Sequence, residues 1–369
     1  MSAIPSTRGS SCNVIVSPES SLSASDNSDL ELYSTQLLSR SPASSLASIE
    51  TLVRERYGIE GRAERLTGER DENFRIHTPH GPGYVLKVSP VGEPDTLADL
   101  TVAVLLHLEH TAPSIPVPRV IRTAEGQTRI EINDSPEGAR TANLCTYISG
   151  KLLSTSTVRT TAQRHACGQL LARLAKALST FEHEACRRTI AWDLRQLPRL
   201  ASLIPGVPEL PDVAFLRAFV AEFTARIAPR LAGLRSQFVH NDFNARNIII
   251  DPADESRIVG VIDFGDAVHT ALIADVAVGV MGQLATPDSA DDAIREFVAG
   301  YCVEQPLRAE EMAILNWLIA GRITQNVVIT AWHRAQNPAT RHFAGYDAQF
   351  FGWRIELARR LTLGSQHEY

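Results

Sequence analysis

The stretch that decides the fold reads His240-Asn241-Asp242-Phe243-Asn244-Ala245-Arg246-Asn247, and a second stretch, Ile262-Asp263-Phe264-Gly265-Asp266, follows it along the chain. Between the two lie a β-rich run at 248–250, a turn at 252–255 and another β-rich run at 258–262. A hairpin of this kind brings Asp242, Asn247 and Asp263 to the same end of two adjacent strands. Three oxygen side chains that converge there suit a hard cation such as Mg²⁺. A carboxylate beside a substrate hydroxyl is also what phosphoryl transfer requires.

Around this hairpin the pattern predicts two lobes preceded by a tail. The first 48 residues contain sixteen serines and no sustained periodicity, so we expect residues 1–45 to be disordered. Residues 46–145 predict a small lobe, with a helix that starts at Leu46 and ends at Gly58, a strand at 84–88 and a helix at 96–109. Residues 146–369 predict a larger, mainly helical lobe that the hairpin interrupts.

Composition excludes several classes of protein. The 369 residues are 44% hydrophobic and 21% charged, which is enough apolar material for a core and argues against a wholly disordered chain. A formal net charge of −6 and a pI near 6.0 give no electrostatic footprint for nucleic acid. We find no 18-residue apolar run and expect no membrane span. Five scattered cysteines without a CxxC pair fit a reducing cytoplasm.

The paired motifs resemble those of a known superfamily. H-x-D-x-x-x-x-N followed by a hydrophobic residue and D-F-G is similar to the catalytic and metal motifs of kinases. The wider context, about residues 46 to 360, resembles the aminoglycoside phosphotransferase and choline kinase-like family. Residues 68–74, Val117-Pro118 and Trp192-Asp193-Leu194 look most like its hydroxylysine kinase branch. The resemblance implies an α+β, two-lobed protein-kinase-like fold with a small antiparallel-sheet N-lobe, one main helix in that lobe, and a larger helical C-lobe.

The resemblance also implies roles for the hairpin residues. Asp242 would orient the substrate hydroxyl and accept its proton. Asn247 and Asp263 would hold Mg²⁺ against the phosphates of ATP or GTP. His240 would brace the loop, and Asp275 would cap or brace the helix that follows.

Nucleotide-binding residues follow from the same resemblance. Lys87, one of only three lysines, would reach the α- and β-phosphates from the third strand. The turn from Gly68 through Asn73 would cover the phosphates, although an ordinary hairpin turn is the alternative for that segment. Thr146 and Ile148 would belong to the hinge whose backbone meets the base.

Two positions depart from the family pattern. Thr101 stands where many relatives place a glutamate that pairs with the strand lysine, so we expect Lys87 to pair with Asp99 or with nothing until nucleotide binds. Asn241 replaces the glycine common between His and Asp in aminoglycoside kinases, which points away from antibiotic resistance. The first departure keeps a nucleotide-binding pseudokinase open as an alternative.

The acceptor is predicted to be small. Only eleven residues separate Asp263 from Asp275, which leaves no room for the activation segment of a protein kinase. We expect Arg322 to anchor an acceptor carboxylate and Asp266 to meet its amine, with Trp192 as a further acceptor-site candidate. A surface arginine and a helix-capping aspartate are the alternatives.

These observations predict a small-molecule kinase of a hydroxylated amine or amino acid, with hydroxylysine as the leading acceptor. Homoserine, choline and aminoglycosides remain alternatives. The expected partners are a nucleotide, ATP or GTP, and a small acceptor. We expect no nucleic acid and no membrane partner, and the oligomeric state is unknown.

Overall fold

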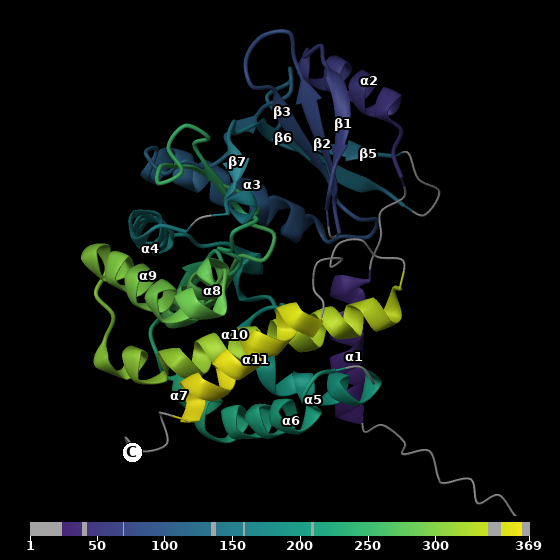
Figure 1. Ribbon diagram of the computed structural model, residues 1–369. Coiled ribbons are helices and arrows are strands. Elements are labelled where there is room, and N and C mark those ends of the chain that lie inside the picture. The colour runs from purple at the N-terminus through teal and green to yellow at the C-terminus, as the bar shows by residue number, and fades with distance from the viewer. Residues whose placement is uncertain are drawn as a thin grey trace, which may run out of the picture.

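The computed structural model describes residues 24–38, 43–68, 70–133, 138–157, 159–207, 210–338 and 348–363. Its chain forms a smaller lobe built on a sheet and a larger lobe built of helices, which lie one above the other in Figure 1. This arrangement confirms the predicted two-lobed α+β fold.

The smaller lobe is an antiparallel sheet in the order β1-β2-β3-β6-β4, with β5 also paired to β6. Its strands are β1 (Arg62–Leu66), β2 (Glu72–His77), β3 (Tyr84–Val88), β4 (Val120–Ile121), β5 (Ile130–Ile132) and β6 (Arg140–Thr146). Phe74 and Ile76 alternate with polar residues in β2, and the buried Leu86 and Val88 of β3 alternate with the less buried Val85 and Lys87, so one face of the sheet is buried. Together they form a core separate from that of the larger lobe.

Two helices accompany this sheet, α2 (Leu46–Tyr57) and α3 (Asp95–Thr111). Helix α2 starts at Ser45, whose side chain accepts a hydrogen bond from the Ser48 N–H. It ends at Gly58, which adopts the left-handed conformation with φ 65°. The predicted boundaries of both helices are confirmed to within two residues.

The larger lobe surrounds a second, extensive core. Its helices are α4 (Thr161–Leu178), α5 (Leu200–Leu203), α6 (Val213–Glu222), α7 (Ala228–Ala232), α8 (Leu272–Gln283), α9 (Ala290–Glu304), α10 (Ala309–Gln336) and α11 (Ala348–Leu363). Small antiparallel sheets interrupt them, formed by β7 (Lys151–Leu152), β8 (Ser236–Val239), β9 (Ile248–Ile250), β10 (Ile258–Val261) and β11 (Val268–Ala271). Strand β11, which pairs with β8, was not expected from the sequence.

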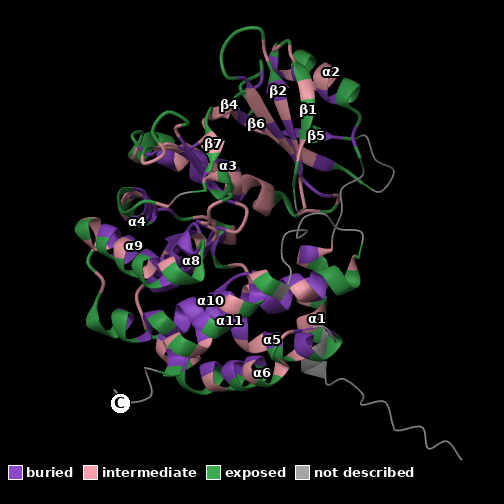
Figure 2. Cartoon of the chain, in the orientation of Figure 1, coloured by how far each residue is buried: buried purple, intermediate pink, exposed green. Residues whose placement is uncertain are grey.

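Helix α10 runs through this lobe and is buried over most of its length (Figure 2). Its length and mean hydropathy would allow it to cross a membrane, although no such segment was expected. However, 83% of its most apolar window is buried inside the structure. It is therefore a core helix of this fold.

The N-terminal segment differs from the expected disordered tail. Residues Ala24–Leu37 form helix α1, which lies against the larger lobe (Figure 1). Tyr33 and Leu37, one turn apart, are buried in the main core, and Tyr33 packs against Trp332 with ring centroids 6.2 Å apart. Burial of two large side chains outweighs the serine-rich composition that predicted disorder. The rest of the predicted tail, residues 1–23 and 39–42, lies outside the described residues.

Candidate active site

The hairpin of β9 and β10 places the predicted site residues. Ile248 pairs with Val261, so the residues just before β9 and just after β10 meet at one end of the hairpin. The Ile262 N–H extends the pairing by donating to the Asn247 carbonyl over 2.9 Å. The structure therefore brings Asp242, Asn247 and Asp263 together as the sequence predicted.

The Asp242 carboxylate is held from several sides. Asn244 Nδ2 donates to Oδ1 over 2.7 Å, and Asn247 Nδ2 donates to Oδ2 over 2.6 Å. Arg322 Nη2 lies 3.5 Å from Oδ1. Burial and the negative charge of Asp266 raise the pKa of Asp242, while the Arg322 guanidinium acts in the opposite direction.

A buried frame supports the loop beneath this carboxylate. His240 Nδ1 accepts from the Asp242 N–H over 3.2 Å, and its Nε2 donates to the Ile262 carbonyl over 3.2 Å. Burial lowers the pKa of His240 to about 4, so the ring is neutral and can fill both roles. Asp275, in the first turn of α8, accepts from the Asn241 N–H over 2.7 Å. His240 thus braces the loop, as expected, whereas Asp275 also braces the loop and does not cap the helix.

Lys87 reaches the hairpin from β3. Its Nζ lies 3.2 Å from Asp263 Oδ1 and 2.8 Å from Asp71 Oδ2, in the turn between β1 and β2. Burial alone would lower the pKa of Lys87, but the two carboxylates outweigh it and raise the pKa. Lys87 in turn lowers the pKa of Asp263.

The expected pairing of Lys87 with Asp99 is wrong. Asp99 lies on α3 and instead contacts Arg129 Nη2 and His183 Nε2, each over 3.1 Å. Asp71 was missed because a turn residue carries no signal of the strand it will face. A carboxylate partner for Lys87 is nevertheless present, although Thr101 stands where the resemblance implies a glutamate.

The donor set at the hairpin suits a hard cation. Asn247 directs Nδ2 at Asp242, which leaves its Oδ1 for another partner, and Asp263 offers a half-exposed carboxylate. Within the described ranges, no group of three or more His, Cys, Asp or Glu residues could hold a metal ion. Two protein oxygens fit Mg²⁺ well, since it keeps several waters and takes its other ligands from phosphates.

The predicted nucleotide-binding turn and hinge flank this site. A Cβ on Gly68 would lie 2.3 Å from the Asp71 carbonyl, so this turn requires glycine, and Asn73 pairs with Lys87 across β2 and β3. The Thr146 N–H donates to the Arg119 carbonyl over 2.9 Å and is not available to a base. Ile148 packs on the hairpin at Gly260, where a Cβ would come within 2.8 Å of Cγ2 of Ile148.

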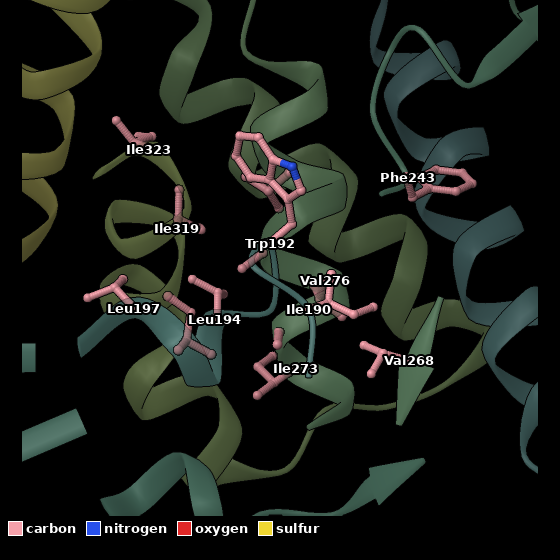
Figure 3. Close-up of a cluster of buried hydrophobic side chains, with 14 of the residues drawn as sticks. Ile190, Trp192, Leu194, Leu197, Phe243, Val268, Ile273, Val276, Ile319 and Ile323 are labelled. Atoms are coloured by element: carbon pink, nitrogen blue, oxygen red, sulfur yellow. The ribbon is translucent and has the colours of Figure 1, made fainter. Parts of the chain in front are cut away.

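The residues expected to bind the acceptor fall into two groups. Arg322 is only 3% exposed, and its Nη1 donates to the Trp192 carbonyl and to Gln325 Oε1. Trp192 lies in the core, between the helix that carries Ile319 and Ile323 and the one that carries Val276 (Figure 3). Both side chains are enclosed by protein in this structure, and their roles at the acceptor stay predictions.

Asp266 is the expected acceptor residue that stays partly exposed. Burial and the charge of Asp263 raise the pKa of Asp266, and Arg188 opposes that effect. Arg188 also donates to the carbonyls of Gly265 and Ala267, so it holds the loop that carries Asp266.

Comparison with known families agrees with this geometry. The model of the phosphotransferase enzyme family matches residues 62–313, which is more than half of the chain and includes the hairpin and Lys87. The chain belongs to this family. It is a kinase that acts on a hydroxyl group of a small molecule.

This chain is distant in sequence from individual relatives. The chain is 24% identical to a hydroxylysine kinase of Mus musculus, over 86% of this chain and 89% of that one. It is 26% identical to a homoserine kinase of Methylobacillus glycogenes, over 67% of this chain and 72% of that one. A solved microcompartment-associated aminopropanol kinase superposes with TM-score 0.67 at 17% identity, over 86% and 98%. An amicoumacin kinase in complex with AMP-PNP and Ca²⁺ superposes with TM-score 0.65 at 17% identity, over 86% of this chain and 94% of that one.

Proposed function

We propose that this kinase transfers the γ-phosphoryl group of ATP or GTP to the hydroxyl of a small hydroxylated amine or amino acid, with hydroxylysine as the first acceptor to test. The observation that carries the proposal is the meeting of Lys87, Asp242, Asn247 and Asp263 at one end of the hairpin. Similarity to hydroxylysine kinases over most of both chains supports the choice of acceptor.

Each of these residues has a chemical task in the proposed reaction. Asp242, oriented by Asn244 and Asn247, receives the proton of the acceptor hydroxyl as the oxygen attacks phosphorus. Lys87 leaves its carboxylate partners for the nucleotide phosphates and neutralises part of their charge. Asn247 and Asp263 would hold Mg²⁺, which when bound would neutralise charge on the transferred group. The remaining work is positioning.

The acceptor class rests on a second comparison. Homoserine kinases match a shorter part of the chain than hydroxylysine kinases do, so homoserine is the runner-up acceptor. Both are amino acids with a free hydroxyl, and Asp266 is the partly exposed acid that we assign to the acceptor's amine. Arg322 is enclosed in this structure, so we assign no residue to the acceptor's carboxylate.

The test is phosphoryl transfer with Mg²⁺ and either ATP or GTP, against hydroxylysine, homoserine, choline, ethanolamine and kanamycin. We expect turnover of hydroxylysine that Asp242→Asn abolishes. Asp254→Asn is the matched control, because it removes one negative charge from the exposed turn of the same hairpin. Transfer that persists in Asp242→Asn would remove the assignment of the base. Nucleotide binding without transfer to any acceptor would favour the pseudokinase.

A further inference from the structure

Two glutamines from distant helices form hydrogen bonds with one short segment near the active site. Gln36 of α1 donates from Nε2 to the Thr189 carbonyl over 2.7 Å and accepts from the Ala191 N–H over 2.8 Å. Gln325 of α10 donates to the Ala191 carbonyl over 2.8 Å and to the Asp193 carbonyl over 3.3 Å. The segment from Thr189 to Asp193 is therefore fixed between the two helices.

Arg322 connects this segment to the active-site carboxylate. Its Nη1 donates to the Trp192 carbonyl over 2.5 Å and to Gln325 Oε1 over 3.0 Å. Its Nη2 lies 3.5 Å from Oδ1 of Asp242, and the Trp192 ring lies 5.0 Å from the guanidinium carbon. A guanidinium held on three sides by protein has little freedom to move, so its position is set by the segment it binds.

Burial makes this connection strong. Arg322 is 3% exposed and Gln325 is fully buried, so their hydrogen bonds do not compete with water. A buried guanidinium also requires a negative partner, and Asp242 is the carboxylate within 4 Å of it in the described structure. The Asp242 side chain thus faces Asn244, Asn247 and Arg322, and the first two lie on its own loop.

We propose that Gln36 and Arg322 are positioning residues for Asp242, with Gln36 acting from α1 through the Thr189–Asp193 segment and Arg322. The inference rests on the proposed role of Asp242 as the base. Neither residue lies within the part of the chain that matches the family, residues 62–313. The N-terminal helix is thereby a functional part of this kinase rather than a passive extension.

The effect of a lost contact should appear in the rate of the chemical step. A displacement of about 1 Å at a reacting group costs about a hundred-fold in rate, and a remote contact should shift Asp242 by less. We expect Gln36→Ala to lower kcat about ten-fold and to leave the KM for nucleotide within about two-fold. Arg322→Lys keeps the charge but cannot hold Trp192, Gln325 and Asp242 together, and we expect a larger loss of kcat.

The experiment measures kcat, both KM values and Tm for the full-length wild type, Gln36→Ala, Arg322→Lys and Asp29→Asn. Asp29→Asn is the matched control, because it weakens the docking of α1 at Arg199 without touching the Thr189–Asp193 segment. The proposal predicts that the control loses Tm but keeps its kcat. A wild-type kcat in Gln36→Ala, or an equal kcat loss in Asp29→Asn, would overturn it. Gln36→Ala decides the matter even if Arg322→Lys does not fold.

Failure of the proposed function gives a different pattern. In that case the wild type shows no transfer, or Asp242→Asn remains as active as the wild type. The positioning proposal fails on its own when the wild type is active, Asp242→Asn is inactive and Gln36→Ala keeps the wild-type kcat.

Discussion

Two non-glycine residues at the active site adopt backbone conformations that side chains usually avoid. Asn241, which precedes Asp242, has φ 60°, and Asp263, which we assign to Mg²⁺, has φ 65°. Asparagine tolerates this region better than most residues, which explains why it can replace the glycine of aminoglycoside kinases. Asn241 is also fully buried, and neither of its amide atoms has a hydrogen-bond partner among the residues that the structure describes. The loop therefore carries a local cost beside Asp242.

The strained backbone and buried amide of Asn241 predict the effect of replacing this residue with glycine. Asn241→Gly keeps the left-handed backbone and removes a buried amide without partners, so we expect an unchanged or higher Tm and a kcat close to wild type. Asn241→Val places a branched side chain at the same φ, and we expect a loss of about 1–2 kcal/mol of stability. Thermal unfolding and kcat of the two variants check this. A severe loss in the glycine variant would show that the amide has a partner in solution.

The carboxylates around Lys87 predict an unusual effect on nucleotide affinity. Asp71 contacts Lys87 Nζ over 2.8 Å, the group that we expect the phosphates to need. Asp71→Asn removes the competitor and a repelling charge, so we expect a several-fold lower Kd for nucleotide. Lys87→Met removes the positive charge and should raise the Kd for nucleotide. Isothermal titration calorimetry measures both, and weaker binding in Asp71→Asn would instead mean that Asp71 orients Lys87 for the phosphates.

At the scale of elements, the sequence predicted what local pattern determines. Strand β3, helix α2 with its Gly58 end, and the β9–β10 hairpin all follow from residues close together in the chain. The features that the sequence did not predict depend on contacts with residues far along the chain. Helix α1 is stabilised by a core built from residues far along the chain, and Arg322 is buried by elements that its own sequence does not reveal.

One such long-range cluster joins the start of α2 to the sheet. Glu72 of β2 accepts hydrogen bonds from Ser44, Arg65 and Arg140, and the Arg140 side chain is almost fully buried. Burial by itself raises the pKa of Glu72, but these hydrogen bonds outweigh it, and the pKa is lower than usual. A carboxyl with a lowered pKa stabilises the fold above its unfolded pKa, and this contribution disappears as pH falls through the folded value.

We therefore expect the cost of Glu72→Gln to depend on pH. At pH 7 the variant removes the charged carboxylate that accepts from Arg65 and Arg140, which should cost about 2 kcal/mol. The difference from wild type should begin to shrink as the pH falls below the ordinary glutamate pKa, about 4.3. It should disappear only at still lower pH, below the lowered pKa at which Glu72 is protonated in the folded protein. Urea unfolding at a series of pH values measures this, with Glu64→Gln on the exposed part of β1 as control. A difference that is constant with pH would contradict the ionic role of Glu72.

At the scale of the whole molecule, the two lobes contact each other at the active site and along α3. Lys87 from the sheet contacts Asp263 from the helical lobe, and Asp99 of α3 contacts His183. The sheet has a core of its own, but Leu100, Val104 and Leu108 of α3 are buried in the core of the larger lobe, so apolar packing joins the lobes as well as these contacts. A ligand that binds residues of both lobes should therefore stabilise the molecule as a unit.

This arrangement predicts a metal-dependent thermal shift. Nucleotide at about a hundred times its Kd should add about 2.7 kcal/mol to the stability of the folded protein. With Mg²⁺ present, ATP or GTP should raise Tm, and EDTA should remove most of the shift. Asp263→Asn should reduce the Mg²⁺-dependent part of the shift. An equal Tm shift with and without Mg²⁺ would contradict the assignment of Asn247 and Asp263 as Mg²⁺ ligands. Comparing the Tm shifts with ATP and GTP would identify the phosphoryl donor.

The enclosed position of α10 has a consequence for how this enzyme can diversify. Most of the helix faces protein, and two of its polar side chains, Arg322 and Gln325, are committed to the segment beside Asp242. Random substitutions there will mostly be lost to misfolding before selection can act on catalysis. In a mutational scan selected for a new acceptor, we expect few tolerated changes in α10. Adaptation should instead draw on partly exposed positions of the site loops, such as Asp266, which can change without rebuilding the interior.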